Sequence, residues 1–131
     1  MIKRNFALVA LLSLSACVTT AATETPLADG NNVPLGRSAY IDGPIIRPVK
    51  VIEDSRCPMN ARCIWAGTVK IEAIWARPGD NRTIELELGK PVPLADGTLE
   101  LTDVSPPRMA GEGRELKSAD YRFSFRFLGG I

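Results

Sequence analysis

The chain has 131 residues, a formal charge of +1, three cysteines and no histidine. This length suits one domain with a single hydrophobic core, and a balanced charge without a run of Lys or Arg excludes the basic face that nucleic-acid binding requires. The absence of histidine removes the commonest general base and a common metal ligand.

The N-terminus has the three parts of a bacterial lipoprotein signal. Two basic residues, Lys3 and Arg4, precede an apolar run over residues 6–14, and Leu14-Ser15-Ala16-Cys17 follows. The run is shorter than the ~20 residues that cross a bilayer, and the small residues before Cys17 suit cleavage. The segment resembles the signals of bacterial lipoproteins. This resemblance implies that residues 1–16 are removed and that Cys17 receives a diacylglyceryl group.

Lipidation of Cys17 has consequences for location and charge. The mature chain would have 115 residues and a formal charge of −1. Each buried methylene of the lipid contributes ~0.8 kcal/mol, so two or more acyl chains hold a protein at the membrane. In the enterobacterial lipoproteins that this signal resembles, an Asp directly after the lipidated cysteine retains the protein in the inner membrane, whereas this chain has Val18 at that position. The resemblance therefore implies a lipid-anchored protein at the periplasmic face of the outer membrane.

The next segment is predicted to be a flexible tether. Residues 18–25 are small and polar without apolar periodicity, and proline and glycine recur as far as Pro44. Random-coil scaling gives such a tether a reach on the order of 20 Å. The predicted organisation is a tether over residues 17–39 and a single β domain over residues 40–131.

Alternation of apolar and polar residues predicts strands in the rest of the chain. The pattern has a period of two over residues 69–76, 84–88 and 121–127, and a further strand is expected over residues 46–52. The Asp96-Gly97 pair predicts a two-residue hairpin turn. No helical period appears. The expected fold is all-β, a small antiparallel β-sandwich or barrel of five to seven strands.

Cys57 and Cys63 remain as a pair once Cys17 carries lipid. In an exported protein such a pair predicts a disulfide. A thiolate metal site would need further Cys or His ligands, and a redox pair has two intervening residues where this chain has five. No metal and no cofactor is expected.

The segment around these cysteines, residues 54–67, reads Asp-Ser-Arg-Cys-Pro, four residues, Cys, one residue, Trp-Ala-Gly. It resembles the signature of a group of small, largely uncharacterised bacterial exported proteins and lipoproteins. This resemblance covers fourteen residues closely and implies a small β domain without a named activity.

The cysteine pair would close a short loop, for which two interpretations are open. The loop is a structural corner, with Trp65 stacked on the disulfide or capping the core, or it is a recognition loop. A constrained loop that displays Met59, Asn60 and Arg62 binds with a low ordering cost. In an inhibitor of an envelope hydrolase, Arg62 would be the natural specificity residue.

A second candidate lies in the long connection over residues 106–118. Connections of this length are uncommon in compact domains and are often mobile or functional. The functional alternative is a flap that binds a partner through Arg108, Arg114 and Lys117.

No catalytic residue is assigned. The chain has no histidine for a nucleophile triad, no glycine-rich phosphate loop and no calcium-loop spacing. The sequence therefore predicts a non-catalytic binding or structural module that contacts an envelope protein or glycan, using Trp65 and the residues displayed by the two loops. The alternative is an inhibitor or modulator of an envelope hydrolase.

Overall fold

A computed structural model describes residues 15–17 and 24–129 of the chain. The elements in chain order are β1 (Val33–Pro34), β2 (Ala39–Tyr40), β3 (Ile45–Asp54), β4 (Val69–Ala76), β5 (Arg82–Glu87), β6 (Val92–Leu94), β7 (Gly97–Ser105), the 3-10 helix η1 (Ser118–Asp120) and β8 (Arg122–Gly129). Among the described residues no helix has the length and apolar character needed to cross a bilayer. The predicted signal peptide lies outside this description, apart from residues 15 and 16.

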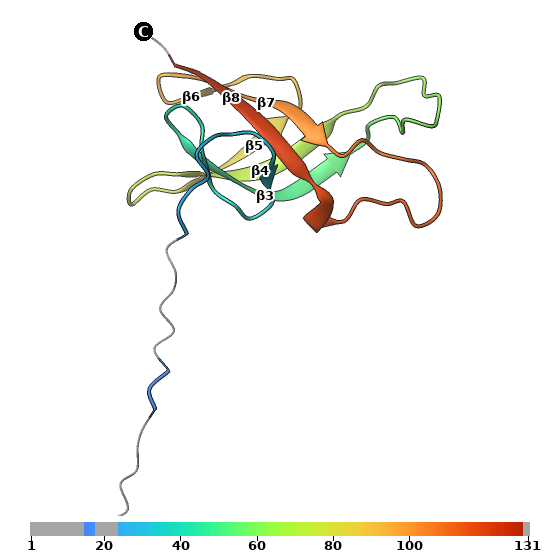
Figure 1. Cartoon of the computed structure of the whole chain (residues 1–131). Helices are drawn as coiled ribbons and strands as arrows, with labels where there is room; N and C mark the ends of the chain where they lie inside the picture. Colours follow the sequence, from blue (N-terminus) through green and yellow to red (C-terminus); the bar gives the residue numbers. More distant parts are fainter. Residues whose placement is uncertain (1–14, 18–23, 130–131) are drawn as a thin grey trace, which may run out of the picture.

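The strands form two antiparallel sheets that pack as a sandwich (Figure 1). One sheet has the order β2-β3-β4-β5 and the other the order β1-β8-β7-β6. The sheets meet along one edge, where Leu88 forms a parallel bridge to Leu101 and the Gly89 amide donates to the Leu101 carbonyl at 2.9 Å. The all-β prediction is confirmed. Eight strands are found in the described part of the chain, and two of them have only two residues.

The core lies between the sheets and uses the faces that the alternation predicts. In β4, Val69, Ile71 and Ala73 are fully buried, while the residues between them are partly exposed. The other sheet contributes Phe123, Phe125 and Phe127 of β8, and Tyr121, the residue before β8, extends this aromatic row. Each of the four side chains is at most 7% exposed. Burial of such large apolar side chains supplies most of the stability of a small domain.

The domain begins earlier than residue 40, so the boundary predicted for the tether is too late. Val33 of β1 is fully buried and pairs with Phe123, and Ala39 of β2 pairs with Ile46. Leu27 also forms a bridge to Ala39. These strands are too short to produce a period of two in the sequence, and the prolines and glycines around them turn the chain between two sheets.

The β6–β7 hairpin differs from the prediction by one residue. Leu94 pairs with Gly97, so Ala95 and Asp96 form the turn, and Ala95 adopts a φ of +52°. Gly97 instead belongs to β7, where a Cβ atom would lie 2.1 Å from the Leu128 carbonyl oxygen. The glycine is required for close approach of the β8 backbone, and not for the turn.

Candidate functional site

Two long loops leave the sandwich at the same end (Figure 1). The disulfide loop, residues 55–68, joins β3 to β4, and the second loop, residues 106–117, joins β7 to η1. Residues 24–27, where the described domain begins, lie toward the opposite end of the sandwich. We refer to the two loops together as the paired loops.

Gly67 closes the base of the disulfide loop. Its φ is +69°, and a Cβ atom at this position would lie 1.8 Å from the Ser55 carbonyl oxygen. The close approach lets the Ser55 amide donate to the Thr68 carbonyl at 2.8 Å, and the Thr68 amide donates to the Ser55 hydroxyl at 3.0 Å. Both the backbone conformation and the contact require glycine.

The predicted disulfide is present. Cys57 and Cys63 are joined, with their Cα atoms 5.8 Å apart. Between them the Ala61 amide donates to the Pro58 carbonyl at 3.1 Å, which makes the segment a turn, and the Cys57 amide donates to the Ala66 carbonyl at 3.2 Å. The loop is therefore cross-linked both covalently and through its backbone.

A carboxylate and a guanidinium lie in the interior of the paired loops. Asp54 accepts two hydrogen bonds from the Arg56 side chain, each 2.9 Å long, and a third from the Tyr121 hydroxyl at 2.8 Å. The Asp54 and Arg56 side chains are only 8% and 14% exposed. The same guanidinium also donates to the carbonyls of Val104 and Pro106, at 2.8 and 3.1 Å. This bidentate pair thus fixes the start of the second loop to the start of the first.

The hydrogen bonds set the ionisation of this cluster. Burial raises the pKa of Asp54, but the hydrogen bonds from Arg56 and Tyr121 and the charge of Arg56 outweigh it, so the pKa lies below its ordinary value. Burial, followed by the hydrogen bond to Asp54, raises the pKa of Tyr121 to about 12. At neutral pH Asp54 is a carboxylate and Tyr121 is a neutral donor, and both oxygens of Asp54 are already occupied by donors.

Further along, the loops bind each other through a side-chain amide. The Asn60 Nδ2 donates to the Ala110 carbonyl at 3.0 Å, and the Ala110 amide donates to the Asn60 Oδ1 at 2.7 Å. The Met59 amide also donates to the Arg108 carbonyl at 2.9 Å, while the Arg108 guanidinium donates to the Arg56 carbonyl at 2.7 Å. The Asn60 side-chain amide thus both donates to and accepts from the Ala110 backbone, as a peptide group of a neighbouring strand would.

Large apolar side chains lie on the outside of the disulfide loop. Met59 is 72% exposed, Ile64 93% and Trp65 83%. Neither Ile64 nor Trp65 belongs to the core cluster, and Met109 of the second loop is 39% exposed. The interpretation in which Trp65 caps the core is therefore wrong, because this side chain is exposed and does not pack against the core.

The residues proposed from sequence for binding fall into two groups. Asn60 and Arg108 hold the loops together and thus position the site. Met59, Arg62 and Trp65 face solvent on the disulfide loop. Sequence reasoning missed Ile64, for which the signal was an apolar pair enclosed between Cys63 and Gly67, and it missed the role of Asp54.

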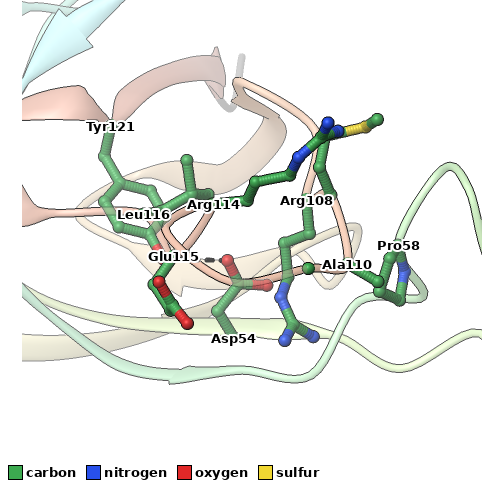
Figure 2. A pocket seen from close by; sticks show the side chains of 10 residues that line it. Asp54, Pro58, Arg108, Ala110, Arg114, Glu115, Leu116 and Tyr121 are labelled. Atoms are coloured by element: carbon green, nitrogen blue, oxygen red, sulfur yellow. Dashed lines mark hydrogen bonds between the residues drawn. The ribbon is translucent and has the colours of Figure 1, made fainter.

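Arg114 of the second loop, the remaining binding candidate, lines a pocket of about 340 Å³ (Figure 2). The pocket lies between the second loop and the end of β3, next to Tyr121. Other residues around it are Asp54, Pro58, Arg108, Met109, Glu115 and Leu116. The lining combines charged and apolar side chains in similar proportion.

Within residues 15–17 and 24–129, no three carboxylate or cysteine side chains lie together in a way that would hold a metal ion. Comparisons with protein-family models, with curated proteins and with solved structures find no match to this chain. The geometry of the paired loops is therefore the basis for any functional inference.

Proposed function

We propose that the protein is a lipid-anchored component of the bacterial cell envelope that uses the paired loops to bind another envelope protein and catalyses no reaction. The observation that carries the proposal is the exposure of Ile64 and Trp65, at 93% and 83%, on a loop that is otherwise fixed. Burial of such side chains against a partner would contribute about 1.5 to 3 kcal/mol each.

The rigidity of the disulfide loop supports a role in recognition. A disulfide, the Asn60 amide and the Gly67 contact hold the loop before any partner arrives. Preorganisation of this kind lowers the entropy lost on binding. Tryptophan is also among the residues that most often dominate the binding energy of an interface.

The kinds of exposed side chain favour a protein partner over a glycan. Methionine, arginine and aromatic residues are enriched in protein interfaces, and Met59, Arg62 and Trp65 are of these types. A sugar ring would stack on Trp65 but would gain little from Ile64. A protein surface with an apolar depression buries both.

Anchoring through Cys17 is consistent with this arrangement. Cys57 and Cys63 share a disulfide, whereas the Cys17 thiol is free and exposed. Residues 24–27 lie toward the end of the sandwich opposite the paired loops, so a tether attached there would leave the loops free to contact a partner (Figure 1). On this proposal the protein acts at the periplasmic face of the outer membrane.

The alternative of a hydrolase inhibitor has less support from the geometry. A substrate-like inhibitor presents an extended segment to the protease, but the residues before Arg62 form a turn in which the Ala61 amide donates to the Pro58 carbonyl. Arg62 is exposed. Its preceding backbone does not have the extended form that a protease cleft binds.

Photo-crosslinking in cells tests the proposal. A photoreactive amino acid at position 62 of the full chain should give one discrete adduct, and the double variant I64S/W65S should abolish it. Position 128 is the matched control, because Leu128 is 59% exposed and lies on β8. Absence of an adduct at position 62, or the same adduct from position 128, would contradict the proposal. Loss of the protein from the membrane fraction in C17S tests the anchor separately.

A further inference from the structure

Hydrogen bonds hold both ends of the disulfide loop, but the segment that displays its exposed apolar side chains lies between them. The last bond before this segment is donated by the Ala61 amide at 3.1 Å, and the first after it is accepted by the Ala66 carbonyl from the Cys57 amide at 3.2 Å. Within the described part of the chain, no hydrogen bond to residues 62–65 is found. Among the described contacts, the disulfide at Cys63 is therefore the only cross-link to this segment.

The contacts between the paired loops do not involve this segment. The Arg56 guanidinium binds both Asp54 and the start of the second loop, and the Asn60 amide binds Ala110. None of these hydrogen bonds uses a sulfur atom, so they can persist when the disulfide is cleaved. Cleavage would then free residues 62–65 and leave the rest of the paired loops in place.

The two sulfur atoms of the disulfide differ in their surroundings. Cys57 is partly buried, and its Sγ lies 3.5 Å from the Pro58 carbonyl oxygen and 3.6 Å from the Ala61 carbonyl oxygen. Cys63 is exposed. An attacking thiolate is negatively charged, so the two carbonyl oxygens disfavour its approach to Cys57, and access favours attack at Cys63. Once the bond is broken, the same carbonyls can accept a hydrogen bond from the Cys57 thiol.

We propose that thiol–disulfide exchange at Cys63 switches the surface formed by Ile64 and Trp65 between a fixed and a mobile form. The inference rests on the proposed function, because it concerns the regulation of that binding surface. The loop is here the substrate of a reductant. It is not the redox-active pair of an oxidoreductase, in which two residues separate the cysteines.

The reductant is a dithiol, and the exchange has two steps. Its thiolate attacks the Cys63 sulfur, a mixed disulfide forms, and Cys57 leaves as a thiolate that takes up a proton. The second thiolate of the reductant then attacks the reductant sulfur of the mixed disulfide and releases Cys63, which also takes up a proton. Two electrons and two protons thus pass from the dithiol to the cysteines, and the reductant becomes a disulfide. Oxidation by such a disulfide reverses both steps.

The two forms differ in the entropy that binding costs. In the oxidised form the backbone of residues 62–65 is held before a partner arrives. In the reduced form these residues become ordered only on binding, and the lost conformational entropy weakens the complex. We expect the reduced protein to bind its partner more weakly by a factor of about ten or more.

The two tryptophans of the chain test the mobility of the segment. Trp65 lies in the segment and Trp75 on β4, so W75F and W65F each leave one reporter. In time-resolved fluorescence anisotropy of the full chain, reduction with dithiothreitol should give Trp65 a fast local motion and leave Trp75 unchanged. Hydrogen exchange of the Ala110 amide should stay slow. An unchanged Trp65, loss of protection at Ala110, or a disulfide that resists reduction in the folded protein would each overturn the inference.

Mass spectrometry tests which sulfur is attacked. Glutathione, a monothiol, forms the mixed disulfide but leaves it unresolved, and iodoacetamide then alkylates the cysteine that was released. Trypsin cleaves after Arg62 and so places the two cysteines on different peptides. Glutathione should be found on Cys63 and the alkyl group on Cys57. Glutathione chiefly on Cys57 would contradict the proposed site of exchange.

Crosslinking in cells links the switch to binding. The yield of the adduct from position 62 should fall about tenfold in C57S/C63S, because the segment is no longer preorganised. Brief treatment of cells with dithiothreitol gives the same comparison without a substitution. An equal yield from the oxidised and reduced forms would overturn the switch and leave the proposed function standing. Absence of any adduct from the oxidised form would instead contradict the proposed function, while the fluorescence and mass measurements still decide whether exchange at Cys63 frees the segment.

Discussion

The sandwich and the paired loops arrange their side chains in opposite ways. In the sandwich, Phe123 and its neighbours are buried and polar side chains face solvent. In the paired loops, the Asp54–Arg56 pair lies inside, while Ile64 and Trp65 are exposed. The hydrophobic effect thus accounts for the sandwich, whereas a disulfide and hydrogen bonds fix the loops. The exposed apolar side chains of the loops are not packed in the core and are available to contact a partner.

The largest expected loss of stability comes from a substitution in the core of the sandwich. Phe123 is fully buried, so F123A should lower the free energy of unfolding by about 4 kcal/mol through lost burial and a residual cavity. F123L is the matched control and should cost about 1 kcal/mol. Denaturant unfolding monitored by circular dichroism measures both. A loss below about 1 kcal/mol for F123A would mean that the aromatic row does not hold the sheets together.

A smaller contribution to stability, which depends on pH, is expected from the Asp54 carboxylate in the paired loops. Because folding lowers the pKa of Asp54, the unfolded chain binds a proton first as the pH falls. The stability that this carboxylate contributes is complete above its ordinary pKa of 3.8 and is lost as the pH falls through the lower folded-state value.

The measurement compares unfolding from about pH 5 to about pH 2 in the wild type and in D54N. D54N should show a shallower loss of stability on acidification, whereas E112Q, which changes an exposed residue of the second loop, should follow the wild type. If D54N and wild type lose stability in parallel, the Asp54 cluster is not what couples the loops to pH.

The smallest expected effect on stability concerns the exposed apolar side chains of the disulfide loop. Because Ile64 and Trp65 are outside the core, I64S/W65S should change the free energy of unfolding by no more than about 0.5 kcal/mol. The same unfolding experiment measures it, with oxidised protein throughout. A loss of 2 kcal/mol or more, in the range of F123A, would show that the two side chains stabilise the fold and would remove the main reason to regard them as a binding surface.

The sequence predicted the long strands well because each has one buried face. The alternation in β4 and the aromatic row of β8 reflect that single constraint, and the structure buries those faces. The two-residue strands β1 and β2 give no such signal, so the domain boundary was placed too late. At the hairpin, Gly97 attracted the turn prediction, yet close approach to β8 is what requires it.

The candidate site was only partly predictable. The disulfide follows from the cysteine count, but the contact of Asn60 with Ala110 joins residues fifty positions apart and leaves no periodic pattern. The role of Asp54 depends on the hydroxyl group of Tyr121, whereas the alternation over residues 121–127 predicts only a strand. The exposure of Ile64 could not be predicted either, because the disulfide loop has no periodic pattern that shows which side chains face solvent.

In the disulfide loop, the residues that hold the backbone differ from the residues that form the exposed apolar surface. Gly67, the two cysteines and Asn60 hold the backbone, and no described hydrogen bond involves the side chains of Ile64 or Trp65. Other residues at these two positions would leave the frame intact and change the shape and polarity that a partner meets. If the paired loops bind a partner as proposed, substitutions at these two positions would change which partner is bound without altering the backbone of the loop.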